Sequence, residues 1–244
     1  EVQSEGSIDP LGLATLANHL ADWILPGLTA RMWRPRFLTA IAAASATVEP
    51  FGEELAKDGI TPTWLVLEWY YVEAIARAAD ADGSQLRRVP GIDKARQALR
   101  DGVPLSADRY LKTPKVFGFH GVYKRLARHV DIVDDNLGLG ENGHRLLRLW
   151  ETEQGLPGFS DPDRSEEEAA RICRTLRDAI GDALREGHTQ RSGSWAGASF
   201  FVRHLAPHQP GPRETAFLWE LLVDSARVPR GEVFNLLRPT EVRR

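Results

Sequence analysis

The sequence predicts a mainly α-helical protein: a helical domain in which a winged-helix-like module with a small β-wing is embedded. Two observations predict the class. Apolar residues recur at helical spacing between Pro and Gly breakers, and no series of segments alternates apolar with polar residues as several strands would. A third observation, the order of short elements in the middle of the chain, predicts the module. Three regions are therefore expected: an N-terminal helical region (1–90), the winged-helix-like module (91–155) and a C-terminal helical region (156–244).

The N-terminal region is expected to contain three helices. The first follows Asp9-Pro10, carries apolar residues at helical spacing and stops at a Pro-Gly pair near residue 26. The second runs from Pro35 through an alanine-rich stretch to Val48. The third covers residues 64–79 and is apolar on nearly every side, so we expect it to be the central buried helix. A turn should end it at residues 80–83.

The rest of the chain is expected to continue as short helices with one hairpin. In the middle region, helices are expected at 93–100, 107–111, 121–130 and 143–153, with a hairpin at 132–139 whose turn is Asp135-Asn136. Residues 156–163 are rich in Pro, Gly and Asp and predict a linker. A capping box of Ser165 and Glu168 then opens a helix to about residue 185. Further helices are expected at 195–205, 214–226 and 232–237.

The composition is that of a globular protein, with 42% hydrophobic and 27% charged residues and a net charge of −3. Cys173 is the one cysteine, which excludes a disulfide framework within the chain. No apolar run reaches the roughly 18 residues of a membrane span, and the acidic start is not a signal peptide. We therefore expect a cytoplasmic protein with no membrane partner. The 26 arginines against 5 lysines indicate a GC-rich bacterial coding sequence.

Charge is sorted along the chain. Residues 109–150 contain eight basic and four acidic residues, and aromatic residues alternate with the basic ones. That combination is typical of a nucleic-acid contact surface. The order of helix, helix, basic helix, hairpin and helix is also that of a winged helix. The residues expected to contact duplex DNA are Arg109, Lys112, Lys115, His120, Tyr123, Lys124, Arg125, Arg128 and Arg145.

The basic helix at 121–130 is expected to act as the recognition helix. Val122, Leu126 and Val130 form one i, i+4 stripe that should pack inward. His120, Tyr123, Lys124 and Arg128 would then face the groove of the nucleic acid.

Four short motifs carry a family resemblance. They are Asp9-Pro10-Leu11-Gly12, Leu25-Pro26-Gly27-Leu28-Thr29, Arg34-Pro35-Arg36-Phe37 and Phe119-His120-Gly121-Val122-Tyr123. Together they resemble uncharacterised prokaryotic proteins that are associated with anti-phage defence loci. The resemblance implies a DNA-related defence component and implies no catalytic residues.

Other motifs predict no chemistry. Residues 138–143 match the G-x-G-x-x-G dinucleotide pattern, but the strands that such a site needs are missing on both sides. His204 and His208 are four residues apart with Pro207 between them, so we expect no metal site. Cys173 is expected to be a buried thiol. We therefore assign no catalytic residue, no metal and no cofactor.

The expected function is that of a non-enzymatic DNA-binding component of a bacterial defence or DNA-processing system, which contacts phosphates more than bases. One alternative is a helical adaptor or scaffold that docks a protein partner, with Trp33 and Trp195 as exposed partner contacts. Another is a fragment of a larger enzyme whose catalytic domain lies elsewhere. That alternative stays open because the sequence begins at Glu1 and its one methionine is Met32.

Overall fold

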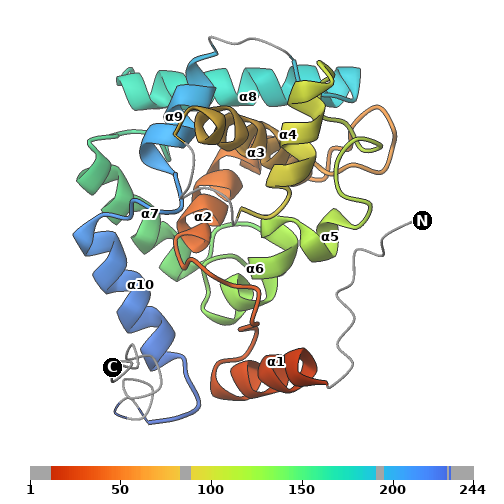
Figure 1. The fold of residues 1–244 in the computed structure, drawn as a ribbon. Coiled ribbons are helices and arrows are strands. Elements are labelled where there is room, and N and C mark those ends of the chain that lie inside the picture. Colours follow the sequence, from red (N-terminus) through yellow and green to blue (C-terminus); the bar gives the residue numbers. More distant parts are fainter. Residues whose placement is uncertain (1–11, 83–88, 191–194, 230, 232–244) are drawn as a thin grey trace.

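The computed structural model describes residues 12–82, 89–190, 195–229 and 231, which form a mainly helical fold (Figure 1). Its elements are α1 (Leu13–Ile24), α2 (Phe37–Val48), the 3-10 helix η1 (Glu49–Phe51), α3 (Thr63–Asp82), α4 (Ile92–Arg100), α5 (Pro114–Phe117), α6 (Phe119–His129), α7 (Glu141–Gln154), α8 (Glu168–Glu186), α9 (Ala196–His204) and α10 (Pro212–Asp224). The described residues contain isolated β-bridges and no sheet. The mainly α class is therefore confirmed.

Helix α3 is the centre of the fold. Because its sequence is apolar on nearly every side, it has no face to present to water, and α2, α4, α6, α8 and α9 all pack against it. Trp69, Val72 and Ile75 are completely buried. The expected central helix is thus confirmed, and it continues to Asp82 through part of the turn that the sequence predicts.

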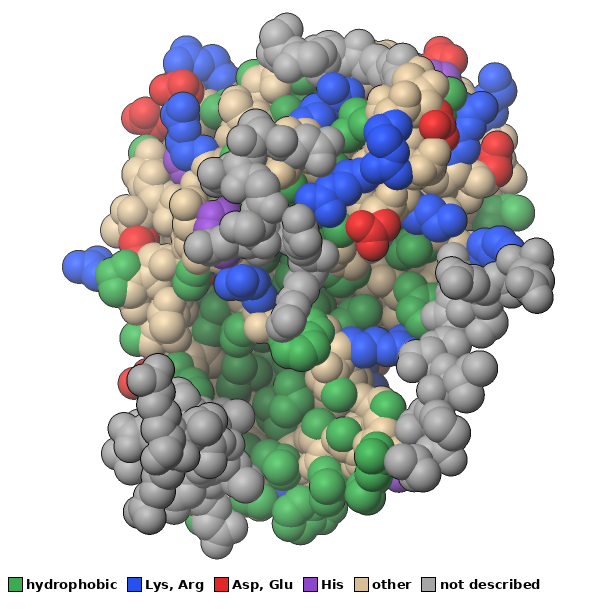
Figure 2. All heavy atoms as spheres, viewed as in Figure 1, with side chains coloured by type: hydrophobic (Ala, Val, Ile, Leu, Met, Phe, Trp, Pro, Cys, Tyr) green, Lys and Arg blue, Asp and Glu red, His purple; other side chains and the backbone are tan. Residues whose placement is uncertain are grey.

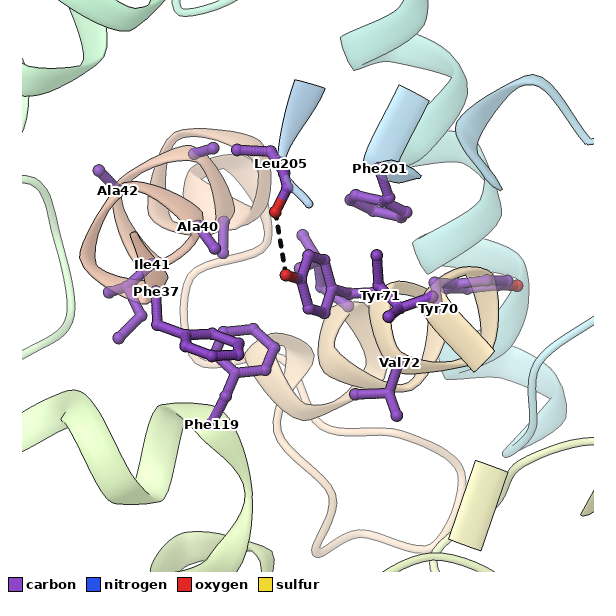
Figure 3. Close-up of a cluster of buried hydrophobic side chains, with 14 of the residues drawn as sticks. Phe37, Ala40, Ile41, Ala42, Tyr70, Tyr71, Val72, Phe119, Phe201 and Leu205 are labelled. Atoms are coloured by element: carbon purple, nitrogen blue, oxygen red, sulfur yellow. Dashed lines mark hydrogen bonds between the residues drawn. The ribbon is translucent and has the colours of Figure 1, made fainter. Parts of the chain in front are cut away.

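Aromatic side chains join α3 to its neighbours (Figure 3). Tyr71 of α3 donates a hydrogen bond of 3.0 Å from its hydroxyl to the carbonyl of Leu205, just beyond α9. Beside it, Phe37 of α2 stacks on Phe119 of α6 with ring centroids 5.6 Å apart. These rings lock the start of α6 against the middle of the molecule.

One contiguous hydrophobic core runs through all three expected regions, from Leu25 to Leu218. The segment 156–163, which the sequence predicts as a linker, takes part in it. Phe159 is fully buried and stacks on Phe200 of α9 at 5.1 Å. Because Phe159 also lies 5.2 Å from the ring of Trp150 in α7, this segment packs α7 and α9 together.

A buried ion pair ties the start of α2 to the C-terminal helices. Arg36 donates from Nε to Glu214 Oε1 at 3.1 Å, and Thr39 donates to the same oxygen at 2.6 Å. The guanidinium also donates to the carbonyl groups of His204 and Ala206, both at 2.7 Å. Burial raises the pKa of Glu214, and the arginine opposes that rise. Because both charges are buried and hydrogen-bonded, the pair fixes one register between α2 and α10.

The expected hairpin at 132–139 is a tight turn with a single antiparallel bridge, between Val133 and Leu139. The reason is local. The Asp134 carboxylate accepts hydrogen bonds from the backbone N–H groups of Asn136 at 2.8 Å and Gly138 at 2.9 Å. This side-chain turn replaces the ladder that two wing strands would form.

Other expected boundaries differ for similar local reasons. Residues 107–111 form a turn, in which Arg109 and Tyr110 both donate to the carbonyl of Ser106, and not a helix. Helix α8 begins at Glu168, and Ser165 does not cap it. The expected turn at residue 83 and the helix at 232–237 lie outside the described residues.

The central position of α3 predicts a large stability effect. Replacing Trp69 by Ala should lower the free energy of unfolding by about 3–5 kcal/mol, because the indole is fully buried and the change leaves a cavity. Replacing Leu16 of α1 by Ala is the control, since that side chain is 54% exposed and should cost less than about 0.5 kcal/mol. Urea unfolding followed by circular dichroism measures both. Equal effects would contradict the described packing.

Candidate functional site

The candidate site is built on α6, whose two faces differ in chemistry. The inward face holds Phe119, His120, Tyr123, Leu126 and Ala127. The outward face holds Lys124, Arg125, Arg128 and His129, of which Lys124 is half-buried. The same helix therefore contributes to the core and presents a basic surface.

Tyr123 does not face outward, so its expected role in nucleic-acid contact is wrong. It is 1% exposed, its ring lies 5.0 Å from that of Phe37, and its hydroxyl accepts a hydrogen bond of 3.0 Å from the backbone N–H of Arg34. Burying Phe119 and Tyr123 removes more apolar area from water than burying Val122 would. The helix is rotated accordingly, and Val122 is only half-buried.

His120 is also buried, 3% exposed, and cannot reach a nucleic acid on the outward face, so this expectation is wrong too. Its Nδ1 lies 3.5 Å from Oε2 of Glu68, and its ring is 5.0 Å from that of Trp64. Glu68 and Trp64 both belong to α3. The side chain is held between α3 and α6 by the network around Glu68.

Glu68 is a fully buried carboxylate that fixes the start of α6. Its Oε1 accepts a hydrogen bond of 2.8 Å from the Tyr110 hydroxyl, and its Oε2 accepts one of 3.0 Å from the backbone N–H of His120. Burial, and then the Glu68 charge, raise the pKa of Tyr110 well above its usual value, so the phenol stays a donor. Gly118 is required here, because a Cβ at this position would overlap Oε1 of Glu68.

A shallow depression of about 560 Å³ lies on the outward face of α6. It is lined by Pro26, Gly121, Lys124, Arg125, Arg128 and His129. No acidic side chain is among these lining residues. The loop before α2 forms its other wall, and Gly27 in that loop approaches the α6 backbone so closely that a Cβ would lie 2.6 Å from Leu126 N.

Lys115 of α5 belongs to the same surface. A Cβ at Gly121 would lie 2.5 Å from the Lys115 carbonyl carbon, so α5 and α6 touch at backbone distance. Partial burial lowers the pKa of Lys124, and the nearby charges of Arg128 and Lys115 lower it further. We call Lys115, Lys124, Arg125 and Arg128 the basic face.

Two carboxylates neutralise part of the basic face. Asp22 of α1 pairs with Arg125 at 3.0 Å, and Asp135 of the tight turn pairs with Arg128. Neither Lys115 nor Lys124 forms an ion pair with any residue in the described part of the chain. The basic face therefore keeps an excess of positive charge.

The remaining expected DNA contacts lie elsewhere. Arg109 and Lys112 are exposed in the loop between α4 and α5 and do not line the depression. Arg145 of α7 stacks over the ring of Phe217 of α10 at 5.4 Å. The structure thus brings together four of the nine residues that the sequence predicts.

Helix α1 carries an apolar stripe on the molecular surface. Leu13, Leu16, Leu20 and Trp23 are each more than half exposed, and no residue of α1 is buried. Figure 2 shows hydrophobic side chains gathered over α1 and in the hollow between α1 and α10. Trp33 is exposed as expected, whereas Trp195 is half-buried against Tyr70 at 4.8 Å.

The other motifs have structural explanations. Gly140 and Gly143 of the G-x-G-x-x-G match pack against the backbone carbonyl groups of Asp131 and Ile132, where no side chain would fit. Cys173 is buried as expected, and burial raises the pKa of its thiol to about 11. Across the ranges that the structure describes, no group of three or more His, Cys, Asp or Glu residues could hold a metal ion.

Sequence reasoning missed Glu68, although a signal was present. Residues 64–79 are apolar except for Glu68, Glu73 and Arg77. A charged residue inside an otherwise apolar helix must be paired or hydrogen-bonded when the helix is buried. That rule, applied to the sequence alone, marks Glu68 as a residue with distant partners.

Comparison of the chain with protein-family models, with curated proteins and with solved structures finds no match. Among the helices described, none combines the length and apolar character needed to cross a bilayer. Function must therefore be argued from the geometry of the chain itself.

The tight contact at Glu68 makes a prediction about two glycines. Gly118→Ala should lower the free energy of unfolding by about 1–3 kcal/mol, because the new methyl group overlaps the Glu68 carboxylate. Gly181→Ala in α8 is the matched control. Its Cβ would find only contacts of 3.7 Å, so the helix should gain about 0.5–1 kcal/mol. Thermal and urea unfolding measure whether each variant is less or more stable than the wild type. A Gly118→Ala variant with unchanged stability would refute the network around Glu68.

Proposed function

We propose that this protein binds duplex DNA through phosphate contacts made by the basic face, Lys115, Lys124, Arg125 and Arg128. The observation that carries the proposal is the depression on α6, which three of these cations line without any acidic side chain. In this proposal the protein acts in the bacterial cytoplasm as a non-enzymatic component of a defence or DNA-processing system.

The spacing of the cations suits a row of phosphates. Lys124 and Arg128 lie one helical turn apart, about 6 Å along the axis of α6, so they can neutralise separate phosphates. Lys115 and Arg125 extend the positive surface to either side. Such contacts position a protein on the duplex without reading its sequence.

The electrostatics of the basic face also favour an anionic partner. The pKa of Lys124 is lowered by burial and by Arg128 and Lys115, so a phosphate nearby would relieve the repulsion among these cations. Arg125, Arg128 and Asp135 are exposed and Asp22 is half-buried, and ion pairs in contact with solvent contribute little stability. Both arginines can therefore exchange a carboxylate for a phosphate at small cost.

In the finer form of the proposal, α4 to α7 act as a winged-helix-like module with α6 as recognition helix. The tight turn at 134–138 takes the place of the wing. The support for this is that Asp135 in the turn pairs with Arg128, so the turn lies beside the outward face of α6. A short turn reaches the phosphates of an adjacent groove less well than a full β-wing does, so α6 would make most of the contacts.

A second candidate function, protein docking, is favoured by the apolar stripe of α1. Exposed apolar patches of this kind mark interaction surfaces. The stripe shares no residue with the basic face, so the two functions can be tested separately. The double variant Leu16→Ser, Leu20→Ser should leave DNA affinity unchanged if the basic face binds DNA.

The salt dependence of binding tests the DNA proposal. The double variant Lys124→Ala, Arg128→Ala should weaken binding of a fluorescent duplex similarly for all sequences. It should also flatten the slope of log affinity against log salt by up to about 1.8, since each phosphate contact contributes about 0.9. Fluorescence anisotropy at several salt concentrations measures the slope. The melting temperature should hardly change, because neither side chain is fully buried.

The matched control is Arg171→Ala, Arg185→Ala on α8. Both residues are exposed, and Arg185 pairs with Asp182 much as Arg128 pairs with Asp135. Arg174 is unsuitable because it donates a hydrogen bond of 2.9 Å to the carbonyl of Ser165. If the wild-type protein shows no salt-dependent duplex binding, or if the control pair matters as much, the proposal is wrong and protein docking takes its place.

A further inference from the structure

A second concavity, of about 650 Å³, lies beside the buried end of α6 and is not explained by DNA binding. It is formed by the end of α2, the segment 49–55, the start of α3, the tight turn at 134–138 and the start of α7, which supplies the exposed His144. Its volume falls in the range of sites that bind small molecules. His120 and Trp64 form part of its wall.

The acidic side chains around this pocket are unneutralised. Glu49, Glu53, Glu54 and Asp134 line it, and no lysine or arginine is among its lining residues. Within the described ranges none of these four carboxylates forms an ion pair. Oδ1 of Asp134 is occupied by two backbone N–H groups of the turn. The pocket is therefore electronegative.

His120 adds a second, independent feature. The residue is only 3% exposed and yet lines the pocket, and its Nδ1 is turned to the core, 3.5 Å from Glu68 Oε2 and without a hydrogen-bond partner. The carboxylate favours the tautomer with the proton on Nδ1, which makes Nε2, on the other side of the ring, an acceptor. Trp64 lies 5.0 Å from this ring and supplies an aromatic surface that attracts cations.

We infer that this pocket binds a small organic cation, an aliphatic amine or guanidine, whose charge meets the carboxylates at the rim and whose donor group meets His120 Nε2. An anion would meet four carboxylates and no lysine or arginine, with His120 and His144 as the histidines of the lining. A neutral ligand would leave those carboxylates unpaired. The site is independent of the basic face, because none of its lining residues belongs to it.

Isothermal titration calorimetry with agmatine tests the inference, since agmatine carries a guanidinium and an amine on a short alkyl stem. We expect one molecule to bind per chain. The double variant Glu53→Gln, Glu54→Gln should weaken binding about tenfold, because it removes two exposed ion pairs without changing shape. In NMR spectra, agmatine should shift the side-chain signals of His120 and Trp64. Duplex DNA should not displace it.

Three controls decide the outcome. Glu166→Gln, Glu167→Gln changes an equally exposed pair of neighbouring glutamates, just before α8, and should leave agmatine affinity within about twofold. N-butylurea, a neutral analogue, should not bind, and inorganic phosphate should not shift the side-chain signals of His120 and Trp64. No heat of binding up to about 10 mM agmatine, the weakest range that calorimetry resolves, would overturn the inference. An equal loss of agmatine affinity in the two glutamine double variants would also overturn it. So would an affinity for N-butylurea equal to that for agmatine.

Discussion

The carboxylate of Glu68 is the constraint on which the arrangement of both surfaces depends. A buried charge is costly unless it is hydrogen-bonded, and Glu68 is satisfied by the Tyr110 hydroxyl and the His120 backbone N–H. The second of these bonds fixes the residue at which α6 begins. From that point the helical period decides which side chains turn outward, so Lys124 and Arg128 face solvent and Phe119 faces the core. The glycine at 118 leaves the space that this contact needs.

One helix thereby separates two regions of opposite charge. The outward face of α6 is basic, whereas the pocket against its buried face is lined by carboxylates. The tight turn at 134–138 contributes to both, because Asp134 lines the pocket and Asp135 pairs with Arg128. An acidic pocket would repel the phosphates that the basic face is proposed to bind. Together the two regions would favour a single orientation of the protein on a duplex, in which the pocket faces away from the DNA.

Much of the fold was predictable from the sequence, but the site was predictable only in part. Helices such as α2, α3 and α7 were predicted to within a few residues, because their periodicity and breakers are local signals. The rotation of α6 was not, since Val122 and Tyr123 are both suitable for burial and only the distant Phe37 and Arg34 decide between them. Likewise, Tyr110 and His120 lie 42 and 52 residues from Glu68, so no local pattern reveals their network. The turn replaced the expected wing because a single carboxylate, Asp134, satisfies the backbone groups that strands would have paired.

In the proposed function, the outward face of α6 is the surface that meets DNA. Hydrogen–deuterium exchange of the full chain, with and without duplex DNA at low salt, tests it most directly, because exchange reports which backbone segments a partner covers. We expect slower exchange in residues 24–28, which include the lining residue Pro26, in the turn at 134–138 and in the exposed end of α6. Helix α8 should be unchanged. Protection confined to α1 and α10, or no protection at any segment, would contradict DNA binding by α6.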